Sequence, residues 1–323
     1  SWQKKFVFNL SLFFILFPLF AIILSPHNLI SWRDFLSSLK YESDVALGKY
    51  VAFYTRQFIG TVPIWFQLTK IFPYALGWPI FVLAFLGFLG LSWRDQKINL
   101  LRLAFLVYFL PTAFLFAKWT RFMAPVFPLM ILLATLFLQK LKIASFFKII
   151  IVIISLIPGL AYLTIYQNLD VRLVASRWIY QNITENAYIL SETANVVDLP
   201  LPHEIYESNK NYHYISFNFY DLEENPFLQK QLEYHLSKAD YIIVPSRRIF
   251  ANHPKERYPF IHQYYKRLFS GELGFRKIAE FDSYPKLNLQ LLFFNWQLRF
   301  PDEAAEETWS VFDHPVVRVY KKL

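Results

Sequence analysis

The chain has 323 residues and no cysteine; 55% of its residues are hydrophobic, 20% are aromatic, and its formal net charge is +9. Soluble globular chains are about 45–50% apolar, so this composition indicates membrane-embedded segments, and the missing cysteine excludes disulfides and thiolate metal sites. Residues 1–166 carry the positive charge, with fifteen Lys and Arg against four Asp and Glu, and residues 167–323 have a net charge of −2. Because the basic residues flank apolar stretches and form no polar basic face, nucleic acid is excluded as a partner.

Five stretches in residues 1–166 are apolar enough to be transmembrane helices. A helix needs about 20 mostly apolar residues to cross the roughly 30 Å hydrocarbon core of a bilayer. The predicted spans are 6–24, 72–92, 99–117, 122–138 and 146–166. Arg102 is expected to snorkel to the headgroups, and Pro125 and Pro128 are expected to be tolerated because neighbouring helices satisfy the freed carbonyls. The sequence therefore predicts an α-helical integral membrane bundle.

The basic residues between these spans predict an orientation. If the five spans alternate in direction, eight basic residues fall on one side of the membrane: Lys4, Lys5, Arg94, Lys97, Arg102, Lys140, Lys142 and Lys148. The positive-inside rule makes that side the cytoplasm. The loop 25–71, the turn 118–121 and the region 167–323 are then extracytoplasmic, in a multi-pass protein of the plasma membrane.

The loop 25–71 has a helical pattern of its own. Apolar side chains recur at helical spacing at Leu29, Trp32, Phe35, Leu36 and Leu39. This pattern predicts an amphipathic helix, which either lies in the outer membrane interface or packs on the transmembrane bundle. A second helix is predicted over 45–59.

Residues 167–323 alternate between helical and strand patterns. Helices are predicted at 171–182, 226–237 and 259–270, and strands at 188–190, 196–199, 239–245, 276–281 and 316–320. Such alternation is typical of a soluble α/β domain. The trio Asp313-His314-Pro315 is interpreted as a turn before the last strand, in which Asp313 bonds its own backbone.

Two cations in the short turn 118–121 are the first candidate site. Lys118 and Arg121 lie at the outer mouth of the fourth span, against the positive-inside trend. One interpretation is ordinary snorkelling; the other is that they hold an anion, for which a lipid-linked phosphate is the natural choice. Arg56 of the outer loop is expected either to join them or to be a solvated surface arginine.

A second candidate site follows the apolar run 239–245. Ligands bind at the carboxyl ends of parallel strands, so Ser246, Arg247 and Arg248 are expected to contact an acceptor. The sequence contains no Gly-rich phosphate loop, no G-x-S-x-G motif and no His spacing suited to a metal, and it identifies no cofactor.

Several segments resemble one family of membrane enzymes. The stretch Lys118–Pro128, which reads KWTRFMAPVFP, is similar to the K-x-x-R-[YF]-x-x-P-x-x-P segment of GT-C class glycosyltransferases related to protein O-mannosyltransferases, the phospholipid-carrier-dependent glycosyltransferases. Further similar segments follow in the expected order: Phe53–Thr61, Ala75–Pro79, Asp170–Ile179, Tyr258–Tyr265, Gly271–Phe275 and Glu306–Pro315.

The resemblance implies transfer of a sugar from a polyprenyl-phosphate donor to a glycan, lipid or protein acceptor outside the cytoplasm. Lys118 and Arg121 would then hold the donor phosphate. The family carries its catalytic acidic residue in a first outer loop that this sequence does not match, and Asp34, Glu42 and Asp44 are not assigned that role. The chain is therefore interpreted as the C-terminal portion of such an enzyme, with no catalytic residue of its own.

Two other classes of function compete with this interpretation. One is a non-catalytic membrane receptor or assembly protein with an extracytoplasmic binding domain. The other is a transporter, which is disfavoured because its charged residues would lie in mid-span.

Overall fold

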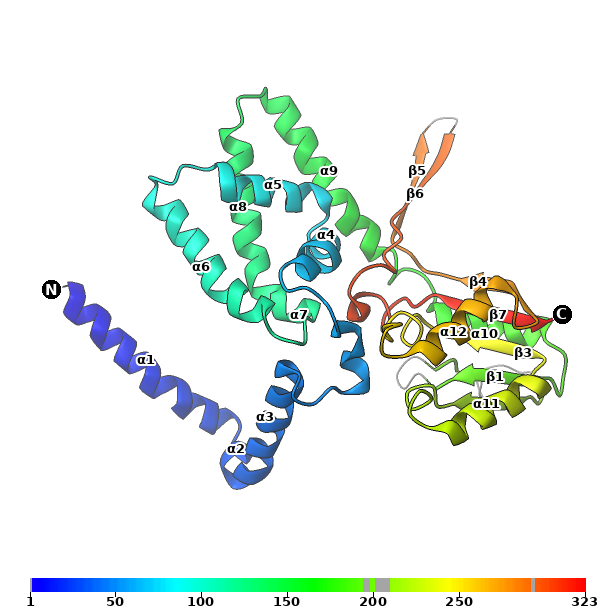
Figure 1. Ribbon diagram of the computed structural model, residues 1–323. Helices are drawn as coiled ribbons and strands as arrows, with labels where there is room; N and C mark the ends of the chain where they lie inside the picture. Colours follow the sequence, from blue (N-terminus) through cyan, green and yellow to red (C-terminus); the bar gives the residue numbers. More distant parts are fainter. Residues whose placement is uncertain (1, 194–197, 201–209, 292–293) are drawn as a thin grey trace. The chain divides into compact units, whose positions relative to one another are not determined.

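The computed structural model describes residues 2–193, 198–200, 210–291 and 294–323. The chain divides into two compact units, Ser1–Ala52 and Phe53–Leu323. The first unit contains α1 (Trp2–Leu24), α2 (His27–Ile30) and α3 (Trp32–Leu47) (Figure 1). The second unit contains a bundle of helices followed by an α/β domain, as the sequence predicts.

The amphipathic helix predicted within the loop 25–71 is present in the first unit, mainly as α3, whereas the helix predicted over 45–59 is wrong. Helix α3 is amphipathic, and Phe35 and Leu39 on its apolar face are exposed. It ends because Gly48 adopts a left-handed conformation with φ 75°, which a residue with a side chain avoids. The following segment in the second unit forms only a short 3₁₀-helix, η1 (Phe53–Phe58).

The bundle of the second unit consists of short and long helices. They are η2 (Gln67–Ile71, a π-helix), α4 (Phe72–Ala75), α5 (Trp78–Gly90), α6 (Gln96–Ala113), α7 (Thr120–Met123), η3 (Ala124–Val126), α8 (Phe127–Lys140) and α9 (Ser145–Leu163). In the described part of the chain, three helical stretches are long and apolar enough to cross a membrane, at Lys5–Leu24, Thr120–Lys140 and Ser145–Leu163. The membrane character that the composition predicts is thus supported.

The predicted span 72–92 is not one helix. Gly77 has a φ of 74° and separates α4 from α5, and Pro79 begins the new helix at its second position. A Cβ at Gly77 would lie 3.1 Å from the ring of Pro158 in α9. The break therefore requires glycine both for its backbone conformation and for the approach of α9.

Arg102 was predicted to snorkel to the headgroups, and this prediction is wrong. It is only 2% exposed, and its guanidinium donates to the carbonyl oxygens of Phe88 at 2.8 Å and Leu91 at 2.7 Å, at the end of α5. It also lies over the ring of Trp93, 3.9 Å from the centroid. The last carbonyls of a helix lack partners within the helix, so Arg102 of α6 serves as the C-terminal cap of α5.

The α/β domain contains seven strands and three helices among the described residues. The helices are α10 (Val171–Asn182), α11 (Pro226–Lys238) and α12 (Pro259–Ser270), and the strands are β1 (Tyr188–Glu192), β2 (His213–Phe217), β3 (Tyr241–Val244), β4 (Phe275–Phe281), β5 (Lys286–Leu291), β6 (Phe294–Arg299) and β7 (Val317–Lys322). Five strands form a mixed sheet in the order β2-β1-β3-β7-β4, in which β2, β1 and β3 are parallel and β7 is antiparallel to both its neighbours. Strands β5 and β6 form a separate hairpin.

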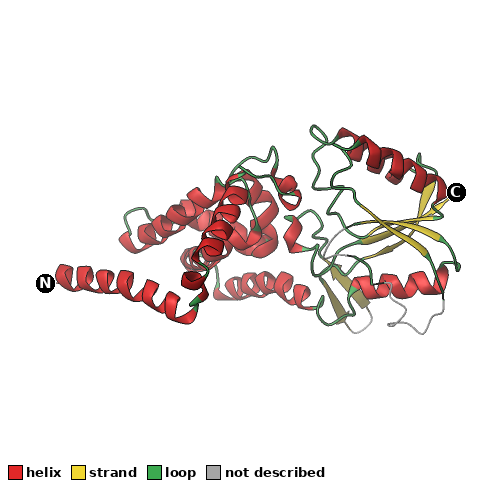
Figure 2. Ribbon diagram, turned by 90° about the horizontal axis from the view of Figure 1, so that it is seen from below, coloured by secondary structure: helices red, strands yellow, loops and turns green. Residues whose placement is uncertain are grey.

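Helices cover both faces of the five-stranded sheet (Figure 2). On one face Leu190 and Ile242 pack with residues of α11 and α12, and on the other Ile189 and Ile243 pack with Ala175 and Ile179 of α10. Successive residues of a strand point to opposite faces, so a central strand covered on both sides must be apolar throughout. This explains why the run 239–245 is recognisable in the sequence.

Most of the predicted elements of this domain are confirmed. The three helices and the strands at 188–190, 239–245, 276–281 and 316–320 are present with small shifts of their ends. Of the predicted strand 196–199, residues 196 and 197 lie outside the described ones, and Asp198 and Leu199 are not in a strand. Strand β2 lies at the edge of the sheet, where its HYISF sequence buries only Phe217, and its pattern is correspondingly weak.

A substitution at Gly87 tests the close packing of α5 on α8. A Cβ at this position would lie 2.5 Å from the carbonyl oxygen of Leu133, a backbone atom that cannot move without shifting α8. We expect Gly87→Ala to lower the thermal unfolding midpoint of the detergent-solubilised protein, because such overpacking costs about 1–3 kcal/mol. Gly159→Ala in α9 is the matched control, since its Cβ would meet nothing within 4 Å. Equal midpoints for the two variants would contradict this packing.

Candidate functional site

Buried and half-buried polar side chains join the helical bundle to the α/β domain. We call them the junction cluster: Gln57, Thr120, Arg248, Asn252, Glu306 and Glu307. The Glu306 carboxylate is its centre, because it accepts hydrogen bonds from the side chain of Gln57 at 2.8 Å and from both the backbone N–H (3.1 Å) and the hydroxyl (3.0 Å) of Thr120. Thr308 adds two further donors. A carboxylate that is 1% exposed needs such partners, and here they come from η1 and from the turn that holds Lys118 and Arg121.

Glu307 occupies the opposite side of the junction cluster. Its carboxylate accepts from Asn252 Nδ2 at 2.6 Å and lies 3.3 Å from Arg248 Nε. Burial raises the pKa of Glu307 to about 7, although the positive charge of Arg248 opposes that shift. Its backbone N–H donates to Gln57 Oε1 at 3.1 Å, so Gln57 contacts both glutamates.

The structure brings Lys118 and Arg121 into one turn but in different environments. Lys118 is buried, its ammonium donates to the carbonyl oxygen of Phe116 at 3.1 Å, and burial lowers its pKa. Arg121 is exposed, and its guanidinium lies 4.1 Å from the ring centroid of Trp119. Trp119 in turn stacks on Tyr54 of η1. The turn thus presents one exposed cation on an aromatic support beside one desolvated cation.

Arg56 points into the α/β domain. It donates to the carbonyl oxygen of Tyr220 and to His253 Nε2 at 2.9 Å, and it lies over the ring of Tyr258. Burial and then the charge of Arg56 lower the pKa of His253 to about 4. The neutral ring therefore donates from Nδ1 to the carbonyl oxygen of Ile249 at 2.7 Å and accepts from Arg56. The structure records contacts of Arg56 with this domain rather than with Lys118 and Arg121.

The side chains of the three residues after strand β3 form hydrogen bonds or ion pairs within the protein. The hydroxyl of Ser246 is buried and accepts from the backbone N–H of Arg248 at 3.1 Å. Arg247 donates to the carbonyl oxygens of Glu303 and of Ala305, the latter at 2.6 Å, and burial lowers its pKa. These three residues hold the segment 303–307 against the end of β3, so an acceptor would have to compete with these contacts.

Asp302 and His314 form a second buried pair. His314 Nε2 lies 2.8 Å from Asp302 Oδ2, which also accepts from Trp309 Nε1 at 3.0 Å. Asp313 was predicted to bond its own backbone. Its carboxylate instead accepts from the hydroxyls of Tyr162 in α9 and Tyr166 just after α9. The trio 313–315 is a turn, and its polar side chains tie that turn to the bundle.

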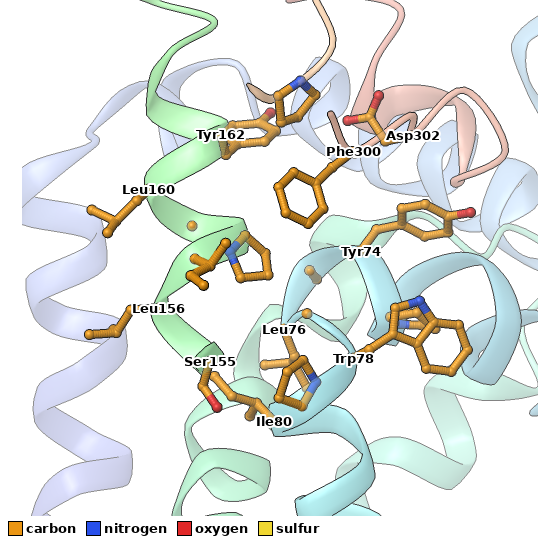
Figure 3. A pocket seen from close by; sticks show the side chains of 18 of the residues that line it. Tyr74, Leu76, Trp78, Ile80, Ser155, Leu156, Leu160, Tyr162, Phe300 and Asp302 are labelled. Carbon is orange, nitrogen blue, oxygen red and sulfur yellow. The ribbon is translucent and has the colours of Figure 1, made fainter. Parts of the chain in front are cut away.

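An apolar pocket of about 880 Å³ lies next to this pair (Figure 3). Its walls are residues 73–80 of α4 and α5, residues 154–160 of α9, and the segment 298–302. Tyr74, Tyr162, Phe300 and Asp302 lie at one end of the pocket in Figure 3, and Leu156 and Ile80 lie toward the other. The lining is thus mostly apolar, with the Asp302 carboxylate at one end and Trp78, Ile80 and Ser155 toward the other.

Glu192 ends β1, the middle one of the three parallel strands, and its carboxyl is as deeply buried as those of Glu306 and Glu307. It accepts from the hydroxyl of Tyr265, and its second oxygen has no hydrogen-bond partner among the described residues. Burial raises its pKa to about 8, while the hydrogen bond from Tyr265 and the charge of Arg318 lower it. Glu192 is thus largely protonated at neutral pH.

Comparisons with known proteins do not identify a family. No family model, curated protein or solved structure matches the chain. Within the described ranges, no group of three or more His, Asp or Glu side chains is placed to hold a metal ion.

Sequence reasoning found the turn 118–121 and missed the residues that position it. Glu306 and Glu307 stand in a polar stretch, and nothing local distinguishes them from solvated surface carboxylates. The pairing with Gln57 spans about 250 positions along the chain and needs the tertiary fold. Glu306 does cap the short 3₁₀-helix η5 (Glu307–Trp309), but glutamate is not among the residues preferred at helix N-termini, so the sequence gives no signal of this role.

Replacing Glu306 tests the junction cluster. We expect Glu306→Ala to strip Gln57 and Thr120 of their buried acceptor, to lower the unfolding midpoint by several degrees, and to make the turn 118–121 more accessible to proteases. Because Thr120 and Glu306 are in contact, the double variant Thr120→Val with Glu306→Ala is expected to lose less than the two single variants together. Glu256→Ala, at an exposed position, is the control. Strict additivity would show that the two residues do not interact.

Glu192 gives the α/β domain a specific dependence on pH. Its pKa is higher in the folded state than the ordinary value of 4.5, so its stabilising contribution is full below pH 4.5 and is lost as the pH rises toward 8, at most about 1.4 kcal/mol per pH unit. We expect the unfolding midpoint of the wild type to fall between pH 5 and pH 8.5 more steeply than that of Glu192→Gln, which carries no titrating group. Parallel pH profiles for the two proteins would show that the carboxyl is not buried as described.

Proposed function

We propose that the chain takes part in transfer of a sugar from a polyprenyl-phosphate donor to an acceptor outside the cytoplasm. The observation that carries the proposal is the pair of cations in the turn 118–121, where the ammonium of Lys118 is buried and Arg121 remains exposed. A buried cation with lowered pKa gains from an incoming anion, and a phosphate can engage both residues. The likeness of this turn and of six further segments to GT-C class glycosyltransferases supports the same assignment.

The membrane arrangement is part of the proposal. We propose five crossing segments, which add the regions of α4 with α5 and of α6 to the three long apolar helices. Helix α5 has 13 residues, or roughly 20 Å, and so needs the preceding α4 to approach the hydrocarbon thickness. This arrangement puts the turn 118–121 and the α/β domain on the extracytoplasmic side of the plasma membrane.

The two cations have distinct roles in the proposed reaction. As the glycosidic bond breaks, negative charge grows on the departing phosphate. Lys118 stabilises it from a site poor in water, where an electrostatic interaction is stronger than in bulk solvent. Arg121 is held by Trp119 and can offer two parallel hydrogen bonds to phosphate oxygens. The apolar pocket between α5 and α9 provides a surface for a lipid chain.

Substitution of the two cations tests the proposal. In the full-length protein reconstituted into proteoliposomes with radiolabelled polyprenyl-phosphate sugars, we expect Lys118→Ala and Arg121→Ala each to lower the rate of sugar transfer roughly 100-fold. Lys140→Ala, at the opposite end of α8, is the matched control and is expected to retain activity. A wild-type protein that neither binds nor consumes any such donor would refute the transferase function and favour a binding role for the outer domain.

A further inference from the structure

The β5–β6 hairpin leaves the five-stranded sheet and extends as a ribbon of its own (Figure 1). Its strands, Lys286–Leu291 and Phe294–Arg299, read KLNLQL and FNWQLR. Each strand is about 20 Å long at the usual rise per residue. A two-stranded ribbon is only marginally stable in water when nothing covers it, so the surroundings of this hairpin need an explanation.

The register of the hairpin sorts its side chains by polarity. Residues paired across an antiparallel ladder lie on the same face, and the pairs alternate between the two faces. Leu287 pairs with Leu298, whereas Asn288 pairs with Gln297, and the two amides hydrogen-bond at 3.0 Å. One face is therefore apolar and the other polar and internally bonded.

The apolar face is open to its surroundings. Trp296 is 68% exposed and Leu298 is 38% exposed. Large exposed apolar groups gathered on one face of an element mark a surface that another apolar phase covers.

The base of the hairpin contacts α9, an apolar helix of membrane-spanning length. The backbone N–H of Lys286 donates to Thr164 Oγ1 at 3.3 Å, just beyond the end of α9, and β5 contacts α9. Leu298 also lines the same pocket as residues 154–160 in the C-terminal half of α9. The hairpin thus starts beside a candidate membrane span and shares its apolar surroundings.

The charged residues at the base suit a headgroup layer. Lys286 pairs with Arg299 across the ladder, and Arg299 forms an ion pair with Asp282 at 2.5 Å and lies over the ring of Tyr284. Cations and aromatic rings in this arrangement gather where membrane proteins meet lipid headgroups. Among the described residues β5 and β6 pair only with each other, so the outer edge of each strand has no ladder partner. Hydrocarbon would not satisfy the backbone groups of such an edge, which favours the interface over the bilayer core.

We propose that the apolar face of the β5–β6 hairpin, with Leu287, Trp296 and Leu298, lies in the lipid interface of the membrane beside α9. The hairpin is then a second membrane contact of the α/β domain, independent of the helical spans and of the sugar-transfer function. It works as an amphipathic helix does at a bilayer surface: the apolar face enters the acyl boundary and the polar face stays in water.

The absence of cysteine makes a direct test possible, since a single introduced cysteine is the only labelling site. Spin labels are attached to Trp296→Cys and, as the matched control, to the neighbouring Gln297→Cys on the polar face. The protein is placed in nanodiscs of phosphatidylcholine and phosphatidylglycerol, one chain per disc. We expect the label at 296 to collide several times more often with oxygen, relative to a water-soluble nickel chelate, than the label at 297.

Two outcomes would overturn the proposal. Equal, nickel-accessible labels at both positions would place the hairpin in water. A label at 296 that is shielded from both reagents, with spin–spin coupling between labels when two chains share a disc, would show that a second copy of the chain covers this face. Both labelled variants are first required to match the wild type in unfolding midpoint, so that a misfolded hairpin is not mistaken for a solvated one.

Discussion

The carboxylate of Glu306 is the contact on which the arrangement of the second unit depends. It is buried, and its hydrogen-bond donors come from η1, from the turn 118–121 and from its own short 3₁₀-helix. A buried carboxylate without these partners would cost several kcal/mol, so the three segments stabilise one another only when all are in place. Among the described contacts between the bundle and the α/β domain, the hydrogen bonds from Thr120 to Glu306 are the ones that directly hold the turn of Lys118 and Arg121.

The neighbouring arginines also have their hydrogen-bond or ion-pair partners within the fold. Arg56, Arg247 and Arg248 all turn toward carbonyl oxygens, a neutral histidine or a carboxylate within the fold. Arginine suits such positions because its planar group has five donors and remains charged when buried. Of the basic residues proposed as contacts for a ligand, Arg121 is the one with an exposed side chain, and this separates it from the arginines that build the scaffold.

The parts of the fold that the sequence predicts are those with local patterns. The run 239–245 is apolar because β3 is covered on both faces, and α12 shows a clear apolar stripe that packs on the sheet. The break at Gly77 and the capping role of Arg102 were missed, because each depends on a neighbour far along the chain or across a loop. Lys118 and Arg121 stood out by their position against the charge trend, whereas the junction cluster has no local signature.

The cap that Arg102 supplies to α5 also makes the end of one helix depend on a side chain of the next. The carbonyl oxygens of Phe88 and Leu91 accept from a guanidinium that is in place only when the first turns of α6 are formed. Unwinding the start of α6 would therefore also deprive the end of α5 of these donors, so the two helix ends open and close together.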